Sequence, residues 1–391
     1  MHSPNRTEPR AVSTECSRRT ALKQCAAGLV AAAAVPALEL QPMKAAEMQP
    51  RPWITIRGLY GGFPQAILDA GKTPGDFGIN AIWVGSGGLQ QAEIERYHQL
   101  GLKVFAEFNS MHASTYLKDH PDAAPIGSDG KPAPPPHGWQ GVSPFHAGYR
   151  QDRMREFRKV LEQFDIDGIW LDYHHAHASW ERDEPAMPDT DFAPAALRQF
   201  REQTGIDLPG ETPAAARMLL STYRDEWTQF RCDVFTDWVR EYREILDEVR
   251  PRALLGTFHC PWSPETHEGA IRHKLAIDLP AQAKYLDVFS IMPYHARFGY
   301  PRDPAWIARQ TAQLGKLLNI QGSASERHKI WPIVQLADWG ENVPVEQVSE
   351  VLDFGTRQPA TGVMVFHWSG ISKQWEKLEA LGRTYRAMHT G

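Results

Sequence analysis

Cysteine is scarce in this chain, with four in 391 residues. Cys16 and Cys25 fall in an N-terminal segment that has the features of a targeting signal, which leaves Cys232 and Cys260 for the folded part. Cys232 lies on the apolar stripe of a long helix predicted over 213–249, as a core residue would. Neither a disulfide framework nor a cysteine metal site is expected.

Long basic runs and a glycine-rich phosphate turn are also missing. The net charge is −5, which argues against nucleic acid as the main partner. Because no glycine-rich turn follows the first predicted strand, a doubly wound nucleotide-binding sheet lacks support. With 42% hydrophobic residues and mixed charge, the composition is that of a globular protein with a large core.

The longest apolar run near the N-terminus, residues 25–37, is too short to span a membrane comfortably. It follows the run SRRTALK at 17–23, which matches the twin-arginine export pattern except at Ala21. We therefore predict a twin-arginine signal peptide and linker over 1–47, a mature domain over 48–391, and a periplasmic or secreted protein without a stable membrane anchor. A disordered basic tail is the alternative.

Apolar segments with strand character recur along the rest of the chain and alternate with helical stretches. This pattern predicts an α/β fold, a (β/α)₈ TIM barrel formed by a single domain with long βα loops. Pro332 is unfavourable within the seventh segment, because proline has no N–H to donate to the sheet. The predicted strands cover 53–57, 80–84, 102–106, 169–171, 253–258, 286–292, 330–335 and 362–366.

Polar and aromatic residues follow these segments, at the end of a parallel barrel where active sites form. Asp172 ends the fully apolar fourth segment and is the strongest candidate among them. The residues at these strand ends are Arg57, Ser86, Glu107, Asn109, Asp172, His174, His175, His259, Glu265, Tyr294, His295, Gln335, Asp338, His367 and Trp368.

Two chemistries compete for this constellation. Glycoside hydrolysis needs two carboxyl groups across a sugar-sized gap, and Asp172, Glu107, Glu265, Glu268 and Asp338 supply candidates. Metal-assisted hydrolysis would use the dense histidines, because the histidine pair at 175–177 has a ligand-like spacing. However, the first segment lacks a His-x-His motif and the chain has no His-Glu-x-x-His motif.

Three runs resemble those of glycoside-hydrolase-like barrels related to the alpha-galactosidase, alpha-amylase and alpha-fucosidase superfamily. They are SDGKP at 128–132, DGIWLDY at 167–173 followed by TGIDLP at 204–209, and YLDVFSIMPYH at 285–295. The resemblance implies that Asp172 is the nucleophile. It also implies a general acid on the loop after the fifth or sixth strand, with Glu265 as the nearest match and Glu268 as the second.

The function expected from the sequence is an exported glycoside hydrolase that acts on an oligo- or polysaccharide without a cofactor or a catalytic metal. A barrel that binds carbohydrate without cleaving it is the rival from another class. We expect Arg57 or Asn109 to keep Asp172 ionised, and Trp262 to keep Glu265 protonated. The catalytic candidates are Asp172, Glu265, Glu268 and Asp338. The substrate-binding candidates are Arg57, Glu107, Asn109, His174, His175, His259, Trp262, Tyr294, His295, Gln335, His367 and Trp368.

The export signal can be tested by changing both Arg18 and Arg19 to Lys. The twin-arginine pathway reads the arginine pair itself, so the variant precursor should stay in the cytoplasm. Cell fractionation and immunoblotting measure this. Normal secretion of the double variant would contradict the assignment.

Overall fold

The computed structural model describes residues 50–389, so the predicted signal over 1–47 lies outside the described residues. One parallel sheet forms the centre, in the order β7-β6-β5-β4-β3-β2-β1-β9-β8. Its strands are β1 Ile56–Tyr60, β2 Ala81–Gly85, β3 Lys103–Asn109, β4 Gly168–Asp172, β5 Leu254–His259, β6 Val288–Ile291, β7 Lys329–Ile330, β8 Ile333–Gln335 and β9 Gly362–Phe366.

The two ends of this sheet belong to one chain segment. β7 pairs with β6 and β8 pairs with β9, yet only Trp331 and Pro332 separate β7 from β8. Pro332 has no N–H to donate, but its carbonyl accepts a hydrogen bond from the Met364 N–H at 2.9 Å. The interrupted seventh strand therefore closes the sheet, and the predicted (β/α)₈ barrel is confirmed.

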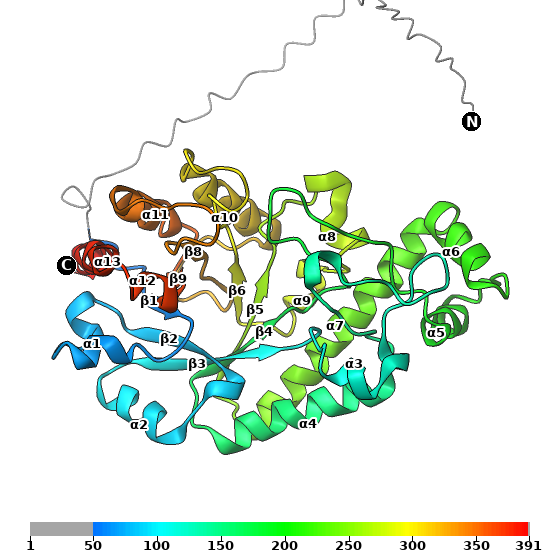
Figure 1. The fold of residues 1–391 in the computed structure, drawn as a ribbon, viewed down its shortest axis with the longest axis horizontal. Helices are drawn as coiled ribbons and strands as arrows, with labels where there is room; N and C mark the ends of the chain where they lie inside the picture. The colour runs from blue at the N-terminus through cyan, green and yellow to red at the C-terminus, as the bar shows by residue number, and fades with distance from the viewer. Residues whose placement is uncertain (1–49, 390–391) are drawn as a thin grey trace, which may run out of the picture. The chain divides into compact units, whose positions relative to one another are not determined.

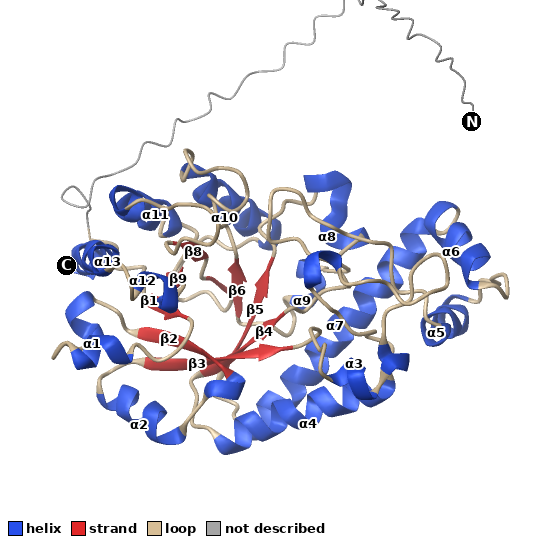
Figure 2. Ribbon diagram, in the orientation of Figure 1, coloured by secondary structure: helices blue, strands red, loops and turns tan. Residues whose placement is uncertain are grey.

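Helices surround the strands, as Figure 1 shows by chain position and Figure 2 by secondary structure. No helix within residues 50–389 combines the length and apolar character needed to cross a bilayer. The α-helices are α1 Gln65–Asp69, α2 Gln91–Gln99, α3 Tyr116–Asp119, α4 Ala147–Gln163, α5 Pro194–Thr204, α6 Thr212–Ser221, α7 Arg224–Val249, α8 Ala270–His273, α9 Leu279–Gln282, α10 Ala305–Leu318, α11 Val348–Gly355, α12 Trp368–Ile371 and α13 Trp375–His389.

Aromatic rings fill the barrel interior. Trp83, Phe105, Trp170 and Trp331 are buried and pack with ring centroids 4.6–6.3 Å apart. The Trp170 indole N–H also donates to the Ser290 hydroxyl at 3.0 Å, so this ring has a polar partner as well as a packed site. Together the rings form a tightly packed core beneath the mouth of the barrel.

The first strand, Ile56–Tyr60, begins and ends three residues later than the predicted strand over 53–57. Gly58 lies inside β1, where the Trp83 ring occupies the space that a side chain would need. Arg57 is consequently not at the strand end. Its guanidinium donates to the carbonyls of Ile54 and Gly78, which precede the strands β1 and β2.

A second apolar cluster lies beside the barrel, where α5, α6 and the start of α7 pack around Phe200, Trp227 and Phe230. The long helix predicted over 213–249 appears as two helices, α6 and α7. These helices lie within the long excursion after β4, so this excursion has a small core of its own.

Gly256→Ala tests the close packing inside the barrel. A methyl group at Gly256 would overlap the rigid indole of Trp170, so the variant should lose about 1–3 kcal/mol of unfolding free energy. Urea denaturation followed by tryptophan fluorescence measures the loss. Gly210→Ala is the control, because nothing lies within 4 Å of the added methyl group. Equal stability of the two variants would contradict the packing account.

Candidate active site

A cavity of about 290 Å³ opens at the carboxyl ends of the strands. Its apolar wall is formed by Phe258, Met292 and Ile333. Its polar groups come from the ends of β1 and β4 and from the loops after β4, β6, β8 and β9. The lining residues are Tyr60, Gly61, Asp172, Tyr173, Glu181, Phe258, Met292, Tyr294, Ile333, Trp339, Phe366 and His367.

Asp172 ends β4 and is only 5% exposed. Its Oδ1 accepts a hydrogen bond from the Tyr173 N–H at 2.9 Å. Burial raises the pKa of Asp172 well above its ordinary value, the negative charges of Glu107 and Glu181 raise it further, and the Tyr173 N–H opposes them. Asp172 therefore holds a proton far more tightly than an exposed aspartate does.

This finding reverses the electrostatic expectation for Asp172. Arg57 lies away from the mouth, and Asn109 uses its Oδ1 to accept the His112 N–H at 3.0 Å. Neither residue is among the causes of the shift in the pKa of Asp172. The expectation that they lower this pKa is wrong, because the charges nearest the carboxyl group are negative.

Glu107, on β3, is the first of these negative neighbours. Its Oε2 accepts a hydrogen bond from the Tyr60 hydroxyl at 2.7 Å, and its carboxyl group is also within hydrogen-bond reach of Asp172. The Glu107 charge and a hydrogen bond from its carboxyl group both act to raise the pKa of Asp172. Tyr60 fixes the outer end of this pair.

Glu181 lines the cavity and is not among the site residues predicted from the sequence. Burial raises its pKa to about 7, Arg297 opposes the rise and Glu107 adds to it. The Arg297 Nε–H donates to the Glu181 backbone carbonyl at 2.9 Å. Next to it, the Trp180 indole N–H donates to His175 Nε2 at 2.9 Å. Seven other acidic residues lie between 179 and 211, and nothing in the sequence singles out Glu181.

Three tyrosine hydroxyls approach the carboxyl groups. Burial raises the pKa of Tyr60 and of Tyr294, and the negative charge of Asp172 is the first cause of the raised pKa of Tyr173. These hydroxyl groups therefore stay protonated and can donate hydrogen bonds. Of the three, only Tyr294 was among our predicted contacts.

Trp339 and His367 complete the rim. The Arg297 guanidinium lies over the Trp339 ring, 4.4 Å from its centroid. His367 Nδ1 accepts from the Gly370 N–H at 3.2 Å, which caps α12, and burial lowers the pKa of His367. His367 lines the cavity, as predicted. Its neighbour Trp368 begins α12 and lies outside the lining.

The other three carboxyl groups predicted as catalytic, Glu265, Glu268 and Asp338, lie outside the cavity lining. Glu265 and Glu268 are exposed, on and beside a short 3-10 turn over Thr266–Gly269. Asp338 accepts hydrogen bonds from Lys377 at 2.9 Å, Gln374 at 2.8 Å and the Val343 N–H at 2.9 Å. Burial acts to raise the pKa of Asp338, but these donors outweigh it and lower the pKa, so Asp338 is suited to remain an anion.

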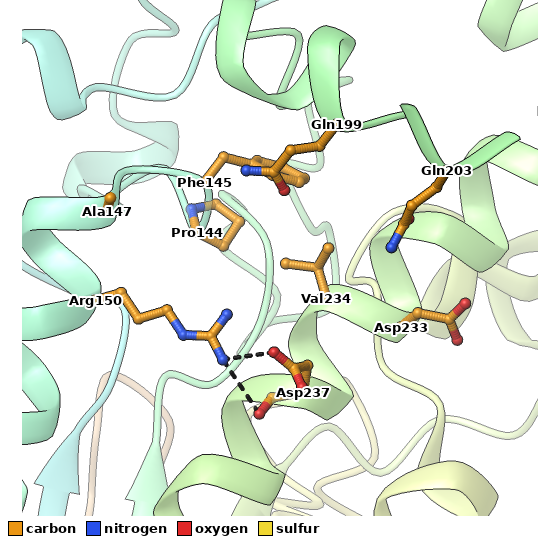
Figure 3. Close-up of a pocket in the computed structure, with 9 residues that line it drawn as sticks. All are labelled: Pro144, Phe145, Ala147, Arg150, Gln199, Gln203, Asp233, Val234 and Asp237. Carbon is orange, nitrogen blue, oxygen red and sulfur yellow. Dashed lines mark hydrogen bonds and ion pairs between the residues drawn. The ribbon is translucent and has the colours of Figure 1, made fainter. Parts of the chain in front are cut away.

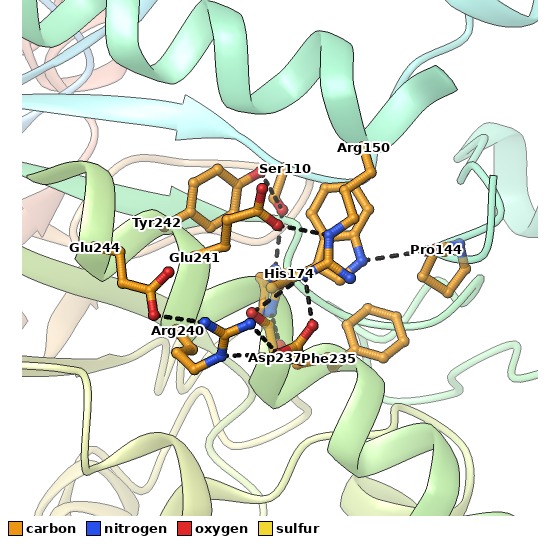
Figure 4. Close-up of polar contacts among 11 residues, drawn as sticks. Ser110, Pro144, Arg150, His174, Phe235, Asp237, Arg240, Glu241, Tyr242 and Glu244 are labelled. Carbon is orange, nitrogen blue, oxygen red and sulfur yellow. Dashed lines mark hydrogen bonds and ion pairs between the residues drawn. The ribbon is translucent and has the colours of Figure 1, made fainter. Parts of the chain in front are cut away.

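The histidines after β4 are bonded to protein groups outside the cavity lining. His174 bridges the Ser110 hydroxyl and the Phe235 carbonyl, each at 2.9 Å (Figure 4). His177 accepts the Gly141 N–H at 3.1 Å and donates to the Pro134 carbonyl at 2.9 Å. No group of three or more His, Cys, Asp or Glu side chains suited to a metal ion occurs within residues 50–389.

His175 is likewise bonded to protein groups: its Nδ1 donates to the Ala176 carbonyl at 2.7 Å, and its Nε2 accepts the Trp180 indole N–H. Burial lowers the pKa of His174 and of His175 to about 4, so both rings are neutral at neutral pH.

Other predicted contacts also form the wall behind the cavity. Gln335 Oε1 accepts the Arg297 N–H at 3.1 Å, and Trp262 packs against Trp180 at 6.3 Å between ring centroids. Burial lowers the pKa of His259 and of His295 to about 4. The predicted contacts that do not line the cavity are Arg57, Glu107, Asn109, His174, His175, His259, Trp262, His295, Gln335 and Trp368.

A separate cavity of about 410 Å³ lies between α4, α5 and α7 (Figure 3). In it, Arg150 donates to Asp237 at 2.6 Å, and outside its lining Arg150 also donates to Glu241 at 2.7 Å. None of the residues predicted from the sequence as catalytic or substrate-binding lines this cavity. The mouth of the barrel is therefore the candidate active site.

No family model and no curated protein matches the chain. Solved structures do match it. The PgaB (BpsB) glycoside hydrolase domain from Bordetella bronchiseptica superposes with a TM-score of 0.61 at 14% identity, covering 86% of this chain and 99% of that domain. The beta-galactosidase from Marinomonas ef1 gives 0.58 at 15% identity, covering 85% of this chain and 59% of that one.

Alpha-L-fucosidase isoenzyme 2 from Paenibacillus thiaminolyticus gives a TM-score of 0.51 at 14% identity, covering 84% of this chain and 48% of that one. The chain thus spans only about half to three-fifths of the galactosidase and the fucosidase. At these identities the likeness concerns the fold, which resembles glycoside hydrolase barrels.

The raised pKa of Glu181 predicts a pH-dependent stability difference between the wild-type protein and Glu181→Gln. In the unfolded chain Glu181 ionises near its ordinary value of 4.5, but in the folded chain it keeps its proton up to about 7. The wild type therefore loses stability relative to Glu181→Gln as pH rises through this interval. Urea unfolding at pH 4.5 and pH 8 should give a gain for the variant at pH 8 only. Glu184→Gln, at an exposed position of the same loop, should give no such difference.

Proposed function

We propose that this protein is an exported glycoside hydrolase that cleaves an oligo- or polysaccharide with two carboxyl groups, Asp172 and Glu181. The observation that carries the proposal is the carboxyl cluster at the barrel mouth, where Glu181 has a pKa of about 7. Carboxyl groups that bind protons near neutrality mark sites of acid–base chemistry. Glycosidic cleavage needs such a pair beside a pocket that can bind hydroxyl groups.

The two carboxyl groups have different roles. Glu181 is the general acid, since a group with a pKa near 7 can give a proton to the leaving oxygen and later take one from water. Asp172 is the nucleophile in its ionised state. In that state the Tyr173 N–H stabilises the Asp172 carboxylate and Tyr60 holds Glu107 in place.

The reaction then balances in two steps. Asp172 attacks the anomeric carbon as the glycosidic bond breaks, and the proton of Glu181 goes to the departing oxygen. Water next attacks the same carbon as ionised Glu181 takes one of its protons, which releases Asp172 and restores Glu181. Because the anomeric carbon is inverted twice, the product keeps its original configuration.

The rest of the cavity suits a sugar. Tyr60, Tyr173 and Tyr294 present hydroxyl groups that stay protonated and can bond to sugar hydroxyls. Trp339 offers an aromatic surface at the rim, and Phe258 adds to the apolar wall. Pockets that combine aromatic walls with a few convergent polar groups are typical of small-molecule sites. Export is proposed from the arginine pair at 18–19 alone.

Asp172→Asn and Glu181→Gln test these roles on aryl glycosides and polysaccharides. Asp172→Asn should lose several orders of magnitude in kcat, because an amide cannot form the glycosyl intermediate. Glu181→Gln should lose about 10²–10⁴-fold on poor leaving groups and much less on activated aryl groups, which need little protonation. The fall in wild-type activity as pH rises through about 7 should disappear in Glu181→Gln.

Glu184→Gln provides the matched control and should behave like the wild type, because Glu184 is exposed outside the cavity lining. NMR of the first product should show retained anomeric configuration. A protein that binds sugars equally well with and without both carboxyl groups, and cleaves none, would be a carbohydrate-binding barrel and would overturn the proposal.

A further inference from the structure

Arg297 lies where three loops of the barrel mouth meet. It belongs to the loop after β6, and its side chain donates from Nε to the Glu181 carbonyl at 2.9 Å. Its Nη1 donates to the Trp339 carbonyl at 3.1 Å and to Glu341 Oε1 at 2.8 Å. One side chain thus ties the loop after β4 to the loop after β8.

The position of Arg297 is itself fixed. Its backbone N–H donates to the Gln335 Oε1, and Gln335 is fully buried at the end of β8. The guanidinium plane is packed over the Trp339 ring, a favourable arrangement for a cation on an aromatic face. A planar group held by donors and by stacking cannot be replaced by lysine without loss of contacts.

We propose that Arg297 is a positioning residue for the reaction: it holds the Glu181 loop against the mouth and keeps a fixed positive charge near the Glu181 carboxyl group. The proposal rests on the glycosidase function proposed for Glu181. Arg297 itself touches no reacting atom. It acts through the place and the proton affinity of Glu181.

The charges around Glu181 show why one cation matters. The ionisable groups that interact with Glu181 come from β3, from β4 and the loop after it, and from the loop after β6. They are Glu107, Asp172, Tyr173, Tyr294 and Arg297. Arg297 is the only cation in this set, and it counteracts the effect of burial on the pKa of Glu181. Without it, Glu181 would hold its proton too tightly to act as a base in the second step.

The test measures the pH at which Glu181 ionises and does not depend on catalysis. The stability difference between each protein and the same protein carrying Glu181→Gln is followed across pH, and its upper midpoint reports the folded-state pKa of Glu181. This midpoint should lie near 7 in the wild type. Arg297→Met should move it up by about one pH unit or more, because an opposite charge is removed. Arg297→Lys should leave it nearer to the wild-type value.

Two further variants separate positioning from general stability. Arg302→Met is the matched control, because Arg302 is exposed farther along the same loop, and its midpoint should stay at the wild-type value. Glu341→Gln removes the acid that partly neutralises Arg297, so its midpoint should move down. If Arg297→Met does not fold, the midpoint measured in Glu341→Gln provides the test instead.

An unmoved midpoint in Arg297→Met or, where that variant does not fold, in Glu341→Gln would overturn the proposal. The alkaline limb of the pH–rate profile should shift in the same directions as the midpoint. A midpoint that moves as expected in a protein without glycosidase activity would leave the role of Arg297 standing and would refute the proposed function instead.

Discussion

The indole rings inside the barrel determine much of what surrounds them. Trp83 and Trp170 fill the interior so closely that the neighbouring strands must carry glycine, at Gly58 and Gly256. Because Gly58 is a packing residue and not a strand end, β1 continues to Tyr60, which then reaches the mouth and holds Glu107. The same closely packed core keeps water from the floor of the site and so favours protonated carboxyl groups above it.

The carboxyl cluster is unfavourable for folding and useful for chemistry. Asp172, Glu107 and Glu181 would repel one another if all were ionised, and the barrel interior offers no cation beyond Arg297 among the residues that act on Glu181. Burial and the neighbouring negative charges raise the pKa of Asp172 and of Glu181, and protonation of these two groups relieves the repulsion. Active sites commonly carry such local instability, which the well-packed remainder of the domain compensates.

The sequence predicted the barrel and part of its mouth because both depend on local pattern. Apolar segments gave eight strands, and the residues at their ends included Asp172, Glu107 and Tyr294, which do lie at the mouth. Glu181 could not be found this way, because its place depends on a contact with Arg297 across 116 residues of chain. The place of Asp338 outside the cavity lining could not be found for a similar reason, since its partner Lys377 belongs to the distant helix α13.

His175, one of the histidines that suggested a metal site, instead limits how far the pH can fall before the mouth loses stability. His175 must be neutral to accept the Trp180 N–H, and Trp180 immediately precedes Glu181. The unfolded chain would protonate His175 near 6.5 but the folded chain only near 4, so this support weakens as pH falls through that interval. Glu181 loses its proton as pH rises through about 7. A neutral His175 and a protonated Glu181 therefore coexist between about pH 4 and about pH 7. The loop after β4 is thus suited to weakly acidic conditions.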